Sequence, residues 1–504
     1  MKGDRNNKKA YEQLVETFKK FKKGCTVADL TARTGLPLEQ VKELVPQIVD
    51  EYSGRLEVTE SGEILYSFPR GFVSKYRGLR ARLRSFLKGV KKISIQVGTW
   101  LFKMWILLML VGYFVLFVVV ALFALLASTV ISVSGSSDER SSSRRGNGIG
   151  GFYAISYVLD LFIRIWFYSE LTRSIDQAYG IDRRPPRPRG RPLHQAVFSF
   201  VFGDGDPNMD WENREKRAVL SYIQANKGII SLPEFMILTG CPPQQAEAEI
   251  LRYCAQFGGT PEVTEAGTLV YQFKELLMNT LQIEKNSGGL TTPIKRLHSF
   301  SKNPPPMNRW FAILNGVNVL FGGYFLVNNL MVGIPAQEHL RGFSYLYTIT
   351  YALLYGLGTN PLGFLFWGMG IVPFVFSILF YLIPIIRYQR LQKKNEEIKT
   401  ENLRKTTYLR IWENPRRVLP SDIHPSTEEY TPRRLKETTE KIIKEMGTYS
   451  VPEVQIEDNQ HEPVYSFPEL EREKEALEIQ RKQADPSAYR LGKTIFDSHG
   501  ETSP

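Results

Sequence analysis

Two charged residues, Asp160 and Arg164, lie four positions apart in an otherwise apolar stretch, residues 152–168. On a helix this spacing places both side chains on one face, where they can form an ion pair. An ion pair at membrane depth either marks a path for an ion or only seals helix packing near the interface. We favour the packing role and predict the pair as an intramembrane site.

A second set of candidate residues is basic. Residues 70–92 hold nine Lys and Arg side chains and no acidic one, beside an apolar stripe at steps of three and four. This pattern predicts either a positively charged flank that stays in the cytosol, which is the safer interpretation, or a helix that lies on anionic lipid headgroups. The side chains expected at the headgroups are Arg77, Arg80, Arg84, Lys88 and Lys91.

Catalytic and metal-binding motifs are incomplete in this sequence. The three cysteines form no CxxC pair and the six histidines are scattered singly, which argues against a zinc site. Residues 204–215 alternate acidic and amide side chains as a calcium loop does, but Met209 replaces the required glycine and Pro207 stiffens the loop. An Asx-turn that caps the next helix is the preferred interpretation. We expect no catalytic residue, no metal and no cofactor, and an enzyme is the least favoured class.

Long apolar segments must position these residues. The chain has 504 residues, a net charge of +12 and a hydrophobic fraction of 43%, yet Lys103 and Asp138 enclose 34 uncharged residues. A helix of about 20 residues crosses a bilayer, so a purely soluble enzyme is excluded. The predicted spans are residues 101–133, 152–169, 310–333 and 362–386, with a re-entrant or interfacial segment at 343–357.

Charge predicts the orientation of these spans. Residues 387–417 carry ten basic and four acidic side chains, and residues 183–191 read RRPPRPRGR. Both stretches favour the cytosol, so the number of crossings should be even, and a fifth span would export the C-terminal tail. We expect a multi-pass protein of the inner (plasma) membrane. Interhelical hydrogen bonding is preferred over a polar path for Asn315, Asn318, Asn328 and Asn329.

An internal repeat organises the polar regions. Shifting the chain by 205 residues aligns 26–68 with 231–273 without a gap, and 12 of 43 positions match. Each copy predicts a helix, a short helix with capping-box spacing that ends in Thr-Gly, a third helix and a β-hairpin. A weaker third copy is predicted in the tail, with a helix at 435–446 and a hairpin at 453–467, but it lacks the Thr-Gly-x-Pro turn.

Three helices closed by a two-stranded wing resemble the winged-helix family, a variant of helix-turn-helix. The resemblance implies a fold whose helix after the turn reads DNA or binds protein. In the first two copies this helix, residues 37–52 and 242–257, carries net charges of −3 and −1. A surface that neutralises phosphates needs Lys and Arg, so nucleic acid is an improbable partner and a cytosolic protein is preferred.

The stretch FSFVFGDGDPNMDW, residues 198–211, also resembles one found in uncharacterised membrane proteins of bacteria and plastid envelopes. The resemblance covers about a dozen residues and implies no activity.

The expected fold class is therefore a polytopic α-helical membrane protein with α+β winged-helix-like cytosolic domains. Its expected function is a scaffold or adaptor for an unidentified protein partner on an anionic bilayer. The alternatives are a transporter or channel with regulatory domains and, less favoured, a membrane-tethered DNA-binding regulator. Self-association stays open.

The expected organisation, in chain order, is winged-helix-like domain 1 (1–69), a basic juxtamembrane helix (70–100), a first span (101–133), a loop (134–151), a second span (152–169), a basic linker (170–209), winged-helix-like domain 2 (210–275), a linker (276–309), a membrane bundle (310–386), a basic linker (387–425), a degenerate third winged-helix-like domain (426–468) and a charged tail (469–504).

Overall fold

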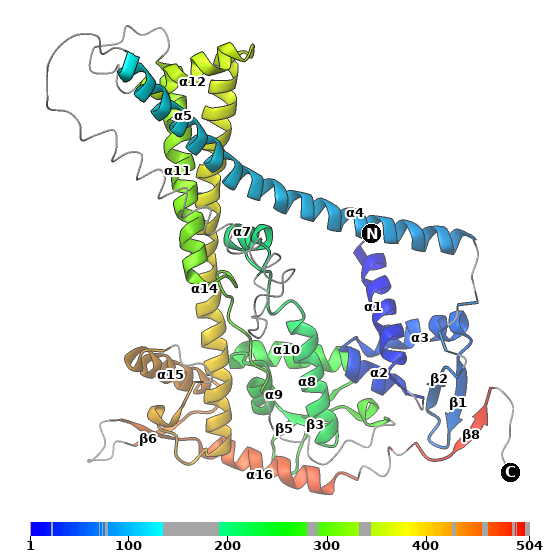
Figure 1. Ribbon diagram of the computed structural model, residues 1–504. Helices are drawn as coiled ribbons and strands as arrows, with labels where there is room; N and C mark the ends of the chain where they lie inside the picture. Colours follow the sequence, from blue (N-terminus) through cyan, green and yellow to red (C-terminus); the bar gives the residue numbers. More distant parts are fainter. Residues whose placement is uncertain are drawn as a thin grey trace, which may run out of the picture. The chain divides into compact units, whose positions relative to one another are not determined.

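The computed structural model describes residues 2–21, 24–69, 71–72, 74–75, 79–134, 191–279, 290, 292–331, 344–425, 430–455, 462–485, 489 and 491–498. These residues are mostly helical and include three small sheets. The chain divides into unit 1 (1–86, 206–298 and 394–504) and unit 2 (87–205 and 299–393), and each is described by itself. Figure 1 labels the elements.

Unit 1 begins with a set of elements that we call module 1. Its second helix starts at a capping box, in which the Thr26 hydroxyl accepts from the Asp29 backbone and the Asp29 carboxylate accepts from the Thr26 backbone. The helix ends at Gly35, which adopts a left-handed φ of 72° that favours glycine. The elements are α1 (Lys2–Phe18), α2 (Val27–Thr34), α3 (Leu38–Tyr52), β1 (Arg55–Thr59) and β2 (Ile64–Ser67).

Module 2 has the same order of elements. Ser231 and Glu234 form the capping box of its second helix, and Gly240 ends that helix with a φ of 74°. The elements are α8 (Trp211–Ala225), β3 (Ile229–Ser231), α9 (Leu232–Thr239), α10 (Pro243–Phe257), β4 (Thr260–Val263), β5 (Leu269–Gln272) and the 3-10 helix η2 (Lys274–Leu277).

Module 3 is built from the C-terminal part of a long helix, α14 (Val372–Glu413), and the segments after it. A 3-10 turn, η6 (Pro420–Asp422), stands where modules 1 and 2 have their capped short helix, in agreement with the missing Thr-Gly-x-Pro turn. The remaining elements are α15 (Pro432–Met446), β6 (Glu453–Gln455) and β7 (Val464–Ser466), followed by α16 (Pro468–Gln483) and β8 (Thr494–Asp497).

The hydrophobic cores of unit 1 follow these modules. Module 1 has a core of its own, which includes Leu14, Leu30 and Ile48. Modules 2 and 3 share one core, in which Phe235 belongs to the same buried cluster as Ile443. Burial of these apolar side chains is the main stabilising contribution, since burying each one contributes on the order of 1.5–3 kcal/mol of transfer free energy.

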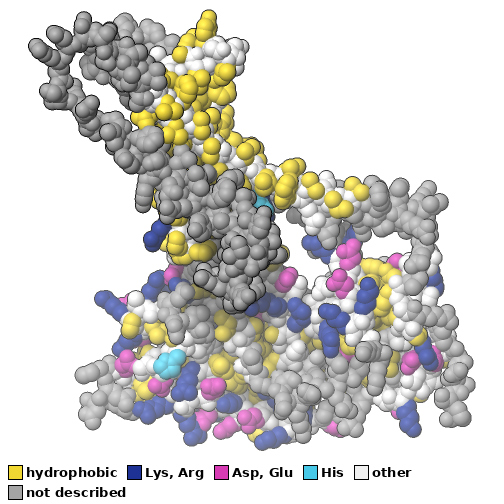
Figure 2. All heavy atoms as spheres, viewed as in Figure 1, with side chains coloured by type: hydrophobic (Ala, Val, Ile, Leu, Met, Phe, Trp, Pro, Cys, Tyr) yellow, Lys and Arg dark blue, Asp and Glu magenta, His cyan; other side chains and the backbone are white. Residues whose placement is uncertain are grey.

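Unit 2 contains the apolar helices. Three helical stretches in the described residues are long and apolar enough to cross a membrane: Ile93–Ala127, Pro305–Leu330 and Pro361–Glu413. Figure 2 shows hydrophobic side chains covering the visible face of these helices, whereas charged side chains gather on unit 1. The elements are α4 (Leu79–Leu107), the π turn η1 (Leu108–Gly112), α5 (Tyr113–Ser134), α7 (Leu193–Phe202), α11 (Pro305–Leu330), α12 (Tyr345–Gly356), α13 (Pro361–Gly363), the π turn η5 (Phe364–Ile371) and α14.

The boundary between the basic helix and the first span differs from the sequence prediction. The basic helix and the first span were expected to meet near residue 100, but α4 runs through that point, and the candidate span begins at Ile93. Uncharged residues continue the apolar character of the helix on both sides of Lys103, so one charge does not end it. The second expected span, 152–169, lies outside the described residues. The helix α12 has 12 residues, about 18 Å, and is too short to cross a core of about 30 Å.

Buried asparagines join the helices of unit 2. The Asn318 side-chain amide donates to the Leu110 carbonyl at 2.9 Å, within the π turn η1. A π turn disturbs the regular ladder of backbone bonds, and in an apolar bundle each carbonyl needs a donor. Asn315 likewise donates to the Ser377 carbonyl of α14 at 2.9 Å, whereas Asn328 and Asn329 donate within their own helix. Asn329 also accepts from the Tyr347 hydroxyl of α12 at 3.1 Å. Interhelical hydrogen bonding is thus confirmed for three of the four asparagines.

Candidate functional site

An extended segment of unit 1, residues 293–298 (PIKRLH), is held along its backbone by three asparagine side chains. Each amide accepts from the backbone N–H and donates to the backbone C=O of one residue. The donor–acceptor distances are 3.0 and 2.8 Å for Asn402 with Lys295, 3.0 and 2.7 Å for Asn208 with Arg296, and 2.8 and 2.9 Å for Asn395 with His298. We call these three residues the asparagine clamp.

In the clamp, asparagine side chains make the hydrogen bonds that a neighbouring strand's backbone makes in a β-ladder. An asparagine amide offers one donor group and one acceptor, which match the N–H and C=O of a single residue. Asn395 and Asn402 are seven residues apart, about two turns of α14, so they lie on one face of the helix. Asn208, from the loop before α8, bonds the residue between theirs. The backbone groups of Lys295, Arg296 and His298 are thereby paired, although these residues belong to none of the described strands.

The side chains of the segment are also engaged. Lys295 forms an ion pair with Glu401, one residue before Asn402. His298 is 9% exposed, and its Nε2 lies 3.6 Å from Asp206 Oδ1. The other oxygen of this carboxylate, Oδ2, accepts from Lys394 at 3.0 Å. Burial lowers the pKa of His298 below its usual value, with Lys394 acting in the same direction and Asp206 opposing both.

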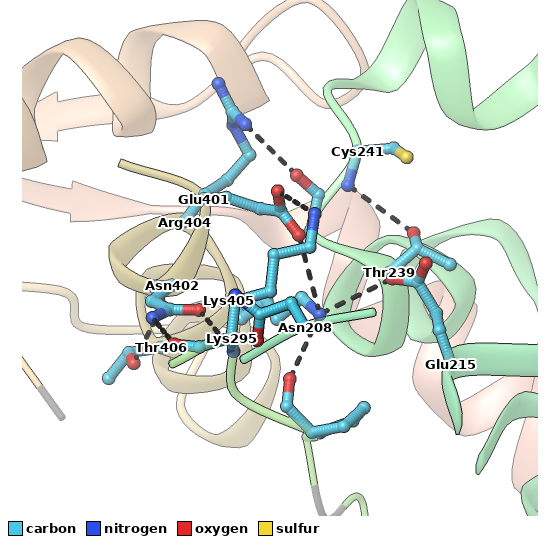
Figure 3. Close-up of polar contacts among 12 residues, drawn as sticks. Asn208, Glu215, Thr239, Cys241, Lys295, Glu401, Asn402, Arg404, Lys405 and Thr406 are labelled. Atoms are coloured by element: carbon cyan, nitrogen blue, oxygen red, sulfur yellow. Dashed lines mark hydrogen bonds and ion pairs between the residues drawn. The ribbon is translucent and has the colours of Figure 1, made fainter. Parts of the chain in front are cut away.

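Next to the clamp lies a fully buried lysine, Lys405, on the charged part of α14 that follows the uncharged run ending at Ile386. Its Nζ donates to the Pro293 carbonyl at 3.1 Å and lies 3.5 Å from Glu215 and 3.9 Å from Glu401 (Figure 3). It also lies 4.6 Å from the centre of the Trp211 ring.

Burial sets the electrostatics of this lysine site. It lowers the pKa of Lys405 and raises that of Glu215, while the opposite charges counteract both shifts. A buried charge is tolerated where it is paired and hydrogen-bonded, and Lys405 is both. Gly240 permits this approach, because a Cβ there would lie 2.8 Å from the Lys405 side chain.

A cavity of about 470 Å³ opens beside Lys405 within module 2. Glu215 and Cys241 line it together with residues of α10. Burial raises the pKa of Cys241, so its thiol is not an activated nucleophile. The described residues of the cavity therefore offer binding surface and no assembled acid–base pair.

Removing one member of the clamp tests its contribution. We expect Asn402→Ala to destabilise the seating of residues 293–298 by about 1–3 kcal/mol, because the Lys295 N–H and C=O lose their partner. Hydrogen exchange of the Lys295 amide in the full-length protein would measure this. Thr400→Ala is the control, since the Thr400 hydroxyl bonds only a carbonyl of its own helix. Equal exchange in the two variants would contradict the clamp.

The residues predicted from the sequence remain predictions. Asp160, Arg164 and Arg77 lie outside the described residues. Arg80, Arg84 and Lys88 belong to α4, of which only the backbone is described there, and Lys91 is exposed on the same helix.

The acidic loop 204–215 distributes its side chains among separate partners. Asp204 accepts from Ser199 and from the Lys302 backbone, and these bonds together with Arg191 lower its pKa to about 2 despite its partial burial. Asp206 accepts from the Asn208 backbone at 2.7 Å, which is an Asx-turn. The turn does not cap the next helix as expected, since the N-cap residue of α8, Asp210, makes no side-chain capping bond. Among the described residues no cluster of three potential metal ligands forms.

Sequence reasoning missed the asparagine clamp. Its three asparagines lie 88, 97 and 107 residues from their partners, and isolated asparagines carry no local signal of such pairing. The buried lysine was equally hidden, because Lys405 is one of ten basic residues in 387–417.

Comparison with known proteins gives one similarity. The chain is 26% identical over 414 residues to an uncharacterised chloroplast protein of Arabidopsis thaliana, and the match covers 77% of this chain and 70% of the plant protein. No protein-family model matches the chain, and no solved structure matches it.

Proposed function

We propose that this chain is a membrane-anchored platform that presents three winged-helix-like modules to protein partners on one side of the membrane. The three modules support this by their pairing. Leu56 opposes Tyr66, Pro261 opposes Tyr271 and Val454 opposes Tyr465, and each tyrosine also pairs with the chain just after the first helix. Three copies of one wing geometry favour a duplicated and then triplicated unit.

The charge of the helix after the turn is the observation that carries this proposal. The only basic residue of α3, Lys42, lies 3.2 Å from Glu39 and 2.9 Å from Glu275 of module 2. Three of the four acidic residues of α3, Glu39, Glu43 and Asp50, are exposed, with the Glu39 side chain 81% exposed. The fourth, Glu51, is half-buried and accepts from the Tyr11 hydroxyl. Such a surface repels phosphates. It suits a protein partner with basic side chains.

The corresponding helix of module 3 is net basic, but most of its basic side chains are already paired. α15 carries five basic and three acidic side chains, net +2. Three of its basic residues are paired, Arg433 with Glu437, Arg434 with Glu396 and Lys436 with Glu462. These pairs compete with any phosphate for the same cations.

The platform is tested by what its surface contacts in native membranes. A photo-crosslinking residue at Leu251, 54% exposed on α10, should capture a discrete protein, and capture should be indifferent to nuclease. The matched control is Ile479, 55% exposed on α16. The proposal fails if the purified full-length protein instead binds random duplex DNA tighter than about 10⁻⁶ M with steep salt dependence.

We further propose that all three modules face the cytosol, as the basic flanks favour. Membrane-impermeant maleimide should label Lys19→Cys, Met209→Cys and Val451→Cys from one side of sealed vesicles. It should label Thr359→Cys, after α12, only from the other side. Cys25 and Cys254 are buried, and the half-buried Cys241 is replaced by serine in every variant, so background labelling should be low. A module that labels together with Thr359→Cys would contradict this topology.

A transporter or channel is the alternative function. It is supported by polar groups in an apolar bundle, including the buried Asn315 and Asn318. Replacing Asp160 and Arg164 together with leucine should abolish an ion flux in reconstituted vesicles if they form its path. An unchanged flux would remove these two residues from any path.

A further inference from the structure

The sheet of module 1 contains a strand that comes from the far end of the chain. Its order is β2-β1-β8, so β8 (Thr494–Asp497) occupies the outer edge of β1. The strands are antiparallel, with Val58 opposite Phe496 and Glu57 opposite Asp497. We call residues 491–498 the tail strand.

Polar contacts hold the tail strand in place. The Arg55 guanidinium donates to both carboxylate oxygens of Asp497, one of these bonds being 2.8 Å from Nε to Oδ1. The Leu56 N–H donates to the Ser498 hydroxyl at 3.0 Å, and the Ser498 N–H donates to the Leu56 carbonyl at 2.9 Å. The N–H groups of the β1–β2 turn donate to carbonyls of the same segment, Glu60 to Lys493 and Ser61 to Leu491. The edge of β1 thus binds the backbone, one carboxylate and one hydroxyl of the added strand.

The equivalent edges of the other modules lack these features. The positions of Arg55 and Leu56 correspond to Thr260 and Pro261 in module 2, as the matching strand registers show. Pro261 has no N–H to offer to an added strand, and a proline at an edge blocks pairing. In module 3 the residue at the Arg55 position is Glu453, which would repel a carboxylate. Only the first of these three edges is built to accept an acidic strand.

The tail strand leaves its large apolar side chains in solvent. Ile495 is 64% exposed and Phe496 is 60% exposed. Apolar burial is the main source of affinity between protein surfaces, and this strand uses little of it. A segment with the same backbone and carboxylate contacts, and with apolar side chains that are covered by the rest of its own protein, would displace the tail.

We infer that the outer edge of β1 is a docking site for an extended, carboxylate-bearing segment of a partner protein, and that the tail strand occupies this site in the free chain. The inference rests on the proposed function as a protein-binding platform and names one binding surface of it. In the partner segment, an acidic residue lies against the Arg55 guanidinium. The next residue is a serine or threonine, whose hydroxyl accepts from the Leu56 N–H. The tail strand acts as an internal competitor whose local concentration is high because it is tethered.

A labelled peptide of residues 491–498 (LGKTIFDS) is the probe, and all proteins are full-length in detergent. The wild-type chain should bind it weakly because its own tail fills the site. Asp497→Lys should release the tail and bind the peptide at least about tenfold more tightly by fluorescence anisotropy. The double variant Arg55→Glu with Asp497→Lys restores an opposite-charge pair, and it should again bind the wild-type peptide weakly. A peptide that itself carries D497K should bind this double variant as weakly as the wild-type peptide binds the wild-type protein, because in each case the protein's own matching tail fills the site.

Hydrogen exchange separates the site from general unfolding. The Leu56 and Glu60 amides should lose protection in Asp497→Lys and regain it with saturating peptide, while Leu44 in the core stays protected. The inference is overturned if Asp497→Lys binds the peptide no more tightly than the wild type does. It is also overturned, in favour of a tail exchanged between two copies, if differently tagged wild-type chains co-purify and lose this association in Asp497→Lys. Crosslinking at Leu251 reports on the platform independently, so failure of the peptide would leave that proposal standing.

Discussion

Replacing Arg481 by alanine should destabilise module 2 by about 3–5 kcal/mol, because the change leaves a buried carboxylate without its cation. Arg481, near the end of α16, donates to both oxygens of Glu234, at 2.9 and 2.7 Å. Glu234 is 1% exposed and also accepts from the Tyr222 hydroxyl at 2.6 Å. The same guanidinium donates to the Ile229 carbonyl, so the substitution also frees a backbone acceptor.

The loss should appear as faster hydrogen exchange of the α9 amides in the full-length protein. Arg472→Ala is the matched control, because Arg472 is an exposed arginine of the same helix. We expect the control to stay within about 0.5 kcal/mol of the wild type, as most surface substitutions do. If Arg481→Ala behaves like Arg472→Ala, the ion pair does not hold α16 against module 2.

Raising the pH from 5 to 8 should lower the stability of unit 1 by up to about 3 kcal/mol through a single carboxyl group, that of Glu473. Burial raises the pKa of Glu473 to about 7, with the Glu234 charge adding to the shift and the Tyr449 hydrogen bond opposing it. Tyr449 donates to both carboxylate oxygens, each at 3.0 Å.

The sign follows from the direction of the shift. A carboxyl with a higher pKa in the folded chain than in the unfolded one binds its proton more tightly when folded. Its contribution is fully present below the unfolded pKa, near 4.5, and is lost as the pH rises through about 7.

Glu473→Gln should remove this slope, since an amide does not titrate and still accepts from Tyr449. Denaturant unfolding of the full-length protein at pH 5, 6, 7 and 8 would measure it. Glu475→Gln, at an exposed position of α16, should keep the wild-type slope. A Glu473→Gln protein that loses stability as steeply as the wild type would show that another group titrates.

Local features of this fold were predictable from the sequence. Thr26 with Asp29, and Ser231 with Glu234, stand three residues apart before an apolar run, and both pairs form the expected capping boxes. Helix caps depend on contacts within one turn, so spacing alone specifies them. Candidate membrane helices were predictable for a similar reason, because length and apolar content decide whether a helix can cross.

Contacts between distant segments were not predictable. Arg55 and Asp497 are 442 residues apart, and neither residue type nor spacing links them. The clamp asparagines share this property, and the π turns of unit 2 depend on tertiary packing that overrides helix propensity. The predicted ion pair Asp160–Arg164 lies outside the described residues and stays a prediction.

The asparagine clamp differs from its surroundings in what it is made of. Its amides carry no charge and do not titrate, so its six hydrogen bonds are independent of pH and are not weakened by salt screening. The adjoining ion pairs, such as Lys295 with Glu401, are weakened by added salt. High salt would therefore loosen the side chains of residues 293–298 and leave their backbone in place. The segment thus has two attachments of different sensitivity, one tuned by solution conditions and one fixed.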